Sequence, residues 1–173
     1  MSVYPDGIDV ARGAVLSDDG VYRYRLTRQW DPGHTFLPFI MLNPSTADAT
    51  DDDPTIRRCV GFARQHGFGG VAVLNLYAYR AMKPAAMWAA AKAGTDIVGP
   101  DTDRRLRNLF EWAGLGGTPV VAAWGAGAKS DRAATVTAMG AGVLHHLGLT
   151  KAGHPRHPLY IPSNTPLTPW SPA

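Results

Sequence analysis

The sequence has few of the residues that build covalent or metal-bound sites. Cys59 is the only cysteine in 173 residues. This excludes an internal disulfide, a four-cysteine zinc site and a cysteine-ligated iron–sulfur cluster within one chain. No apolar run reaches the roughly 18 residues that span a bilayer, and no charged-then-apolar leader opens the chain. We therefore expect a cytoplasmic protein without a membrane segment, cofactor or metal.

The composition suits one folded domain over residues 1–173. Hydrophobic residues make up 45% of the chain, which is enough for a substantial core. We expect residues 1–34 to form an N-terminal hairpin extension and residues 35–173 an α/β core. The net charge of +3 permits a polyanionic partner without requiring one, and the composition leaves the oligomeric state open.

Apolar runs alternate with helical patterns along most of the chain. Tyr22, Tyr24 and Leu26 follow the turn 18–20 at period two, which predicts an amphipathic hairpin at a sheet edge. Buried strands are predicted within 36–45, 70–79, 118–128 and 142–150, and helices within 51–67, 83–94, 99–114 and 129–139. This order predicts a three-layer α/β/α sandwich with a central, mainly parallel four-stranded sheet.

Polar residues end several of the predicted strands. Asn43-Pro44-Ser45, Asn75 and Trp124-Gly125 each follow an apolar run, and a proline-rich loop over 148–167 follows the last strand. In parallel sheets the ligand sits at the carboxyl ends of the strands. We therefore expect these segments to meet at one functional edge.

Four segments carry a family resemblance: "MLNPSTAD", "DDPTIRRC", "AAWGA" and "LGLTKAGHPRHPLY". Together they resemble domain-of-unknown-function family 1643, from about Leu37 to Leu167, a family without an established activity. The chain more distantly resembles the uracil-DNA glycosylase superfamily. That resemblance rests on four segments in the same order, namely 42–45, 73–75, 124–129 and 154–159.

The glycosylase resemblance implies roles for the first and last of these segments. Asn43 would position the attacking water, and Ser45 or Thr46 would contact a phosphate. A histidine of the late loop would stabilise the departing base; His157 is preferred because Pro158-Leu159 follows it, and His154 is the alternative. Leu159 would wedge into the base stack. A plain turn at 43–45 and a merely rigid late loop are the structural alternatives.

Other candidates come from residue chemistry. The Asn75 amide offers a donor and an acceptor to a base edge, or pins a loop. Tyr77 and Trp124 would contact a base, or pack in the core. The cationic residues predicted to contact phosphate are Arg80, Lys129 and Arg156.

Carboxylates cluster at 48–53 and suggest the group that removes a proton from water. Asp52, with Asp51 as its alternative, is the predicted general base, since an asparagine cannot act as one. Asp53 is predicted to cap the helix that follows it. Water-mediated Mg²⁺ binding by the aspartates is a second interpretation.

The predicted function is a hydrolase that cleaves the N-glycosidic bond of a damaged or modified base in a nucleic acid, DNA in the first place. Two alternatives stay open: a non-catalytic nucleotide or modified-base binder, and a small-molecule nucleotide or nucleoside hydrolase.

Overall fold

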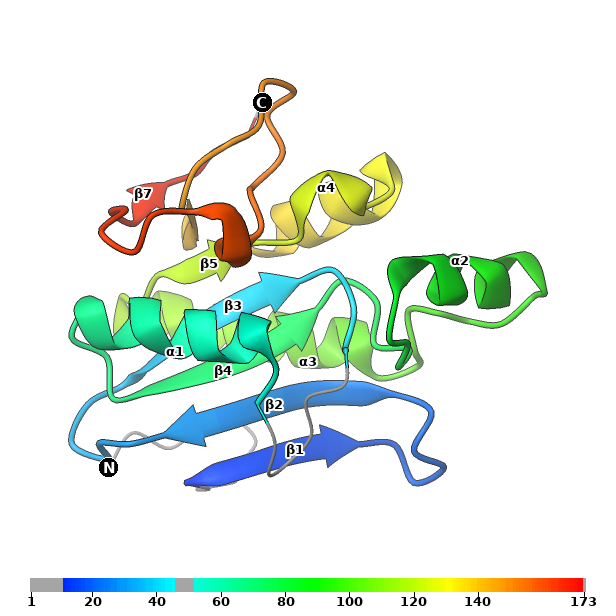
Figure 1. Cartoon of the computed structure of the whole chain (residues 1–173), viewed down its shortest axis with the longest axis horizontal. Helices are drawn as coiled ribbons and strands as arrows, with labels where there is room; N and C mark the ends of the chain where they lie inside the picture. The colour runs from blue at the N-terminus through cyan, green and yellow to red at the C-terminus, as the bar shows by residue number, and fades with distance from the viewer. Residues whose placement is uncertain (1–10, 46–51, 173) are drawn as a thin grey trace.

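One mixed sheet organises the protein (Figure 1). The computed structural model describes residues 11–45 and 52–172. In these residues seven strands pair in the order β1-β2-β4-β3-β5-β6-β7. The strands are β1 (Arg12–Leu16), β2 (Arg23–Gln29), β3 (Phe36–Met41), β4 (Gly70–Asn75), β5 (Val120–Ala122), β6 (Leu144–His146) and β7 (Thr168–Pro169).

Four α-helices accompany the sheet over the same described ranges. They are α1 (Pro54–Gln65), α2 (Pro84–Lys92), α3 (Thr102–Gly116) and α4 (Ser130–Met139), with short 3₁₀ turns η1 (Gly125–Gly127) and η2 (Pro158–Tyr160). Measured over residues 11–45 and 52–172, no helix has the length and apolar character needed to cross a membrane.

The strands β4, β3, β5 and β6 run parallel, as the alternation of strands and helices predicted. The hairpin lies at an edge of the sheet as predicted, but the sheet has seven strands in the described residues rather than four. β2 pairs antiparallel with β4, with Leu26 opposite Val73, and β7 pairs antiparallel with β6. The hairpin therefore extends the sheet, and the two-residue β7 was too short to leave a pattern in the sequence.

β2 alternates polar and apolar side chains as predicted for the hairpin, but its polar face is not exposed to solvent. Tyr24 and Leu26 are buried as expected, but Arg23, Arg25 and Thr27 on the other face are buried as well. β2 lies between β1 and β4, so both of its backbone edges are paired, and its side chains are buried on both faces.

The core has two parts. One contains buried residues of α1, among them Cys59 and Phe62, packed on β3 and β4. The other contains residues of α2, α3 and α4, such as Met87, Leu109 and Val136. Burial of a side chain the size of Phe62 contributes about 1.5–3 kcal/mol.

The start of α1 is as predicted. Asp53 is its N-cap, with the Ile56 N–H donating to Asp53 Oδ1 at 2.8 Å, and Pro54 occupies the first turn. Gly67 follows the helix with a positive φ of 79°, a conformation that glycine adopts at low cost. α1 therefore begins at the carboxyl edge of the sheet, directly beside the loop that follows β3.

The late loop crosses the same edge. Figure 1 shows η2 above α1, and two hydrogen bonds hold it there: Arg58 donates from Nε to the Pro158 carbonyl at 3.3 Å and from Nη2 to the Ile161 carbonyl. The fold thus brings the beginning of α1, the ends of three parallel strands and the late loop together.

Candidate functional site

A pocket of about 180 Å³ lies at this edge. It is lined by the ends of β3, β4 and β5, the first turns of α1 and α2, and the late loop. Its polar or aromatic lining residues are Arg23, Asn43, Ser45, Asp53, Thr55, Asn75, Trp124 and His157, and apolar residues such as Met41, Val73 and Met82 complete the wall. Five of the residues predicted from the sequence are therefore together: Asn43, Ser45, Asn75, Trp124 and His157.

Two buried donors of this pocket lack hydrogen-bond partners. Asn75 is 3% exposed and Trp124 2% exposed, and neither Asn75 Nδ2 nor Trp124 Nε1 bonds to any residue in the described part of the chain. Buried donors are nearly always paired, because an unpaired one costs about 1–3 kcal/mol. Asn75 and Trp124 are thus lining residues of this pocket whose buried donors lack partners within the described chain.

A carboxylate stands at the start of α1. Asp53 Oδ1 accepts the Ile56 N–H, and Oδ2 accepts the Ser45 hydroxyl. The same residue lines the pocket. Asp53 therefore caps the helix and also presents a negative charge to whatever occupies the pocket.

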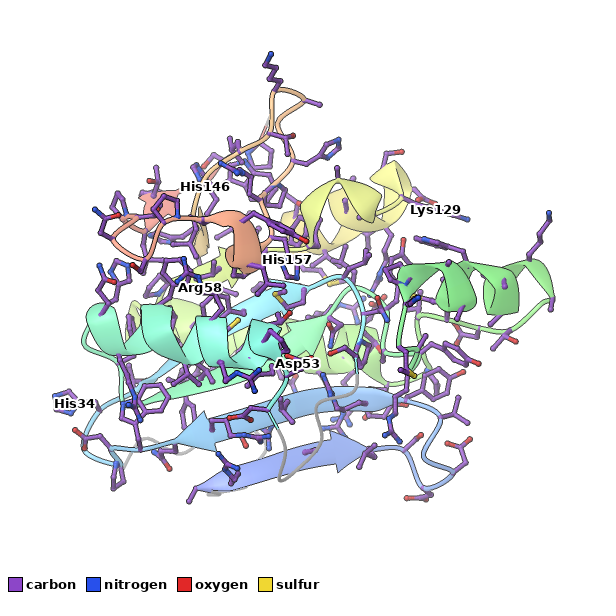
Figure 2. The ribbon with its side chains drawn as sticks, viewed as in Figure 1. His34, Asp53, Arg58, Lys129, His146 and His157 are labelled. Carbon is purple, nitrogen blue, oxygen red and sulfur yellow. The ribbon has the colours of Figure 1, made fainter. Side chains whose placement is uncertain are left out.

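His157 faces this carboxylate from the late loop. Figure 2 shows both residues near the N-terminal end of α1. The Leu159 N–H donates to His157 Nδ1 at 3.3 Å, so the neutral ring carries its proton on Nε2. Burial lowers the pKa of His157 below its ordinary value, and attraction by Asp53 only partly opposes this effect. His157 is thus a neutral Nε2–H donor at neutral pH.

Asn43 has a structural contact as well as a place in the pocket. Its Nδ2 donates to the Ala81 carbonyl at 3.0 Å, which ties the loop after β3 to the segment before α2. Its carbonyl oxygen Oδ1 has no hydrogen bond with a residue in 11–45 or 52–172, and it is the atom suited to accept from water.

A family model described as "Protein of unknown function (DUF1643)" matches residues 23–159 of this chain. The match includes β2 to β6, all four helices and the residues of the pocket. The chain belongs to the DUF1643 family. No curated protein and no solved structure matches it. The description of the DUF1643 family carries no activity, so the chemistry must be argued from the pocket.

Several predicted residues of this DUF1643 protein lie outside the pocket. Asp52 is paired with Arg28 at 2.7 Å, and its carboxylate is not part of the lining. His154 lines a neighbouring cavity of about 560 Å³, which shares Trp124 with the pocket. Asp52 and His154 were the predicted base and the alternative histidine, and neither is among the residues that line this pocket.

The predicted phosphate contacts are dispersed. Arg80 donates to the Gly20 carbonyl at 3.0 Å, and Arg156 donates to the Tyr160 carbonyl at 3.1 Å. Lys129 and Tyr77 line a third cavity, and neither is among the residues that line the pocket. Leu159, the predicted wedge, is 39% exposed and lies in η2 beside His157. Thr46 is outside the described residues.

Three residues with a place at the site were missed as site residues. Asp53 was assigned to capping, with Mg²⁺ binding as the second interpretation, although its position after a strand and loop could have marked it as a pocket residue. Arg23 lines the pocket from β2, and an arginine in an alternating strand pattern was the available signal. Arg58, which holds the late loop, left no signal because its partners are backbone carbonyls about a hundred residues away.

Proposed function

We propose that the pocket binds a single nucleobase and that the protein hydrolyses the N-glycosidic bond of a damaged or modified base, in DNA in the first place. The two unpaired donors, Asn75 Nδ2 and Trp124 Nε1, are the observation that carries this proposal. The ring nitrogens and carbonyl oxygens of a nucleobase lie along one edge and accept such donors.

The volume of the pocket supports a ligand of one ring system. Sites for drug-sized ligands commonly measure about 300–1,000 Å³, whereas this pocket measures about 180 Å³. A whole nucleotide would have to leave its sugar and phosphate at the mouth. A base that has been flipped out of a nucleic-acid strand would bind in this way, with the base in the pocket and the sugar and phosphate outside it.

His157 and Asp53 have the chemistry for hydrolysis. A water oxygen bonds to the anomeric carbon while the glycosidic bond breaks and its electron pair passes to the base. Asp53 accepts a proton from the water, and Asn43 Oδ1 orients it. His157 donates its Nε2–H to the base as negative charge develops there. In this scheme Asp53 takes the role that the sequence had suggested for Asp52.

The proposal also includes a similarity between this fold and that of the uracil-DNA glycosylases. One core contains α1 and the other contains α2, α3 and α4, which is what a three-layer α/β/α sandwich of the uracil-DNA-glycosylase type requires. The four parallel strands and the late loop at their carboxyl ends support the same relation.

One observation favours a non-catalytic base-binding protein instead. Both carboxylate oxygens of Asp53 already accept hydrogen bonds, from Ile56 and Ser45. Transfer of a proton from water to Asp53 would have to compete with these bonds. A protein that only holds a modified base would use the same pocket without turnover.

Base release distinguishes the two functions. Oligonucleotides carrying uracil, deaminated purines or bulky modified bases are incubated with the wild type, His157→Ala and the control His154→Ala. We expect release by the wild type, a loss of about a hundredfold in rate for His157→Ala, and no change for His154→Ala. Binding of a substrate without release of any base would establish the binder.

A further inference from the structure

The third cavity, of about 290 Å³, lies between α2 and α4 and takes no part in the chemistry above. Its charged and aromatic lining residues are Tyr77, Trp88, Lys129, Asp131 and Arg132. Figure 2 shows Lys129 in the region between these two helices. Two of its members, Tyr77 and Lys129, were singled out in the sequence as ligand contacts.

Arg132 is the residue that points to a ligand. It is 9% exposed, its Nε donates to the Leu76 carbonyl at 2.8 Å, and its Nη1 lies 2.7 Å from the Asp103 carboxylate. Its buried Nη2 has no hydrogen-bond partner anywhere in the described residues. Arg132 lines the cavity, and an oxygen acceptor of a ligand would give its unpaired Nη2 a hydrogen-bond partner.

Two more donors surround the same space. The Tyr77 hydroxyl oxygen accepts the Lys129 N–H at 3.3 Å, which leaves the hydroxyl proton for an acceptor. The Lys129 ammonium lies 5.4 Å from the centre of the Trp88 ring. α4 is ten residues long and begins at this point without a side-chain cap, so the positive end of its dipole adds to the attraction.

The remaining lining limits what the ligand is. Asp131 brings one negative charge into the wall and accepts the Arg132 N–H at 2.8 Å, so a highly charged polyphosphate is disfavoured. Trp88, with Ile97 and Val98, provides an aromatic and apolar surface. The lining therefore suits a single phosphate group with a ring attached to it.

We propose that the cavity between α2 and α4 is a second site, which binds one phosphate group of a nucleotide through Lys129, Arg132 and Tyr77, with Trp88 against the attached ring. The site stands independently of base hydrolysis, because none of these four residues lines the first pocket. The phosphate belongs either to a free nucleotide or to the end of a strand.

The test follows the Trp88 signal by ¹⁹F NMR in protein labelled with 5-fluorotryptophan, assigned with Trp88→Phe. The probes are inorganic phosphate, a deoxynucleoside, its 5′-monophosphate, and one short oligonucleotide with and without a 5′-phosphate. We expect the phosphate-bearing probes to shift the signal and the deoxynucleoside to leave it unchanged. Preference for the monophosphate over the phosphorylated strand identifies a free nucleotide, and the reverse identifies a strand end.

Variants make the result specific. Lys129→Ala should weaken binding of the monophosphate by at least about tenfold, and Tyr77→Phe by about threefold to tenfold. Lys92→Ala, which removes an equal charge from an exposed position of α2 outside the cavity, should have no effect. His157→Ala should not alter the response, which separates this site from the first pocket. No response to any phosphate-bearing probe, or an unchanged affinity in Lys129→Ala, would overturn the proposal.

Discussion

Ser45 and Asp53 are joined by a hydrogen bond from the serine hydroxyl to Oδ2 of the carboxylate. Ser45 follows β3 and Asp53 caps α1, so this bond connects a strand end to a helix start across the edge of the pocket. The cap and the site therefore share one side chain. Neutralising Asp53 and neutralising the adjacent Asp52 should therefore have different effects on activity and stability.

Asp53→Asn should reduce base release by about a hundredfold to ten-thousandfold, because the carboxylate that accepts the proton is lost. Its effect on stability should be below about 1 kcal/mol, since asparagine is also a good N-cap. Asp52→Asn should instead lower stability, because it breaks the ion pair with the buried Arg28. The rate of base release by the folded protein should stay unchanged. Single-turnover rates and urea unfolding measure both quantities. Full activity in Asp53→Asn would remove the carboxylate from the mechanism.

Asn75→Leu should weaken base binding without destabilising the protein. The Asn75 Nδ2 donor is buried without a partner in the described chain, so an apolar side chain of similar size removes a penalty rather than a bond. Affinity for the base should fall by about tenfold to a hundredfold. Asn75→Asp, which keeps the shape but replaces the donor, should lose the same affinity. Thermal unfolding and equilibrium binding are the measurements, and a marked loss of stability in Asn75→Leu would show that the amide is structural.

Acid should weaken the protein through His157. Burial lowers the pKa of His157 below the ordinary value of 6.5, so the unfolded chain binds this proton more readily than the folded one. The stability that depends on the neutral His157 ring is fully present above pH 6.5 and is lost as the pH falls through the lowered pKa of His157. Binding that depends on the neutral ring should decline in the same direction.

The comparison with His157→Gln isolates this effect. The variant should have a smaller loss of stability between pH 6.5 and more acidic values than the wild type. Histidine resonances followed by NMR give the pKa directly. A His157 pKa at or above the ordinary value would contradict the buried environment described for the ring.

Arg58→Ala should loosen the late loop. Both hydrogen bonds from Arg58 to the backbone of η2 and Ile161 disappear, and His157 loses its support. We expect faster tryptic cleavage after Lys151 and Arg156, together with weaker base binding by about tenfold. Arg64→Ala is the matched control, because Arg64 lies in the last turn of α1 and contacts Trp30 instead. Equal cleavage rates in both variants would show that Arg58 is not the tether.

Local patterns predicted much of this structure from the sequence. The periodicity of apolar residues and the residues that flank each segment predicted the four parallel strands and the four helices. Asp53-Pro54 predicted the start of α1. These features depend on neighbours within a few residues, through capping, backbone geometry and side-chain periodicity. The meeting of Asn43, Asn75 and Trp124 at one edge follows from the same logic, since parallel strands end on the same side.

Tertiary contacts decided the rest. The pairing of β2 with β4 and the late addition of β7 are non-local, so no local pattern distinguished a seven-stranded sheet from a four-stranded one. The choice between His154 and His157 depended on the path of the late loop, which Arg58 holds from α1. Asp52, the predicted base, is paired with Arg28, whereas Asp53, the predicted cap, also lines the pocket. For the histidines and the aspartates, nearby residues have the same chemistry, and a partner distant in the sequence determines which of them lines the pocket.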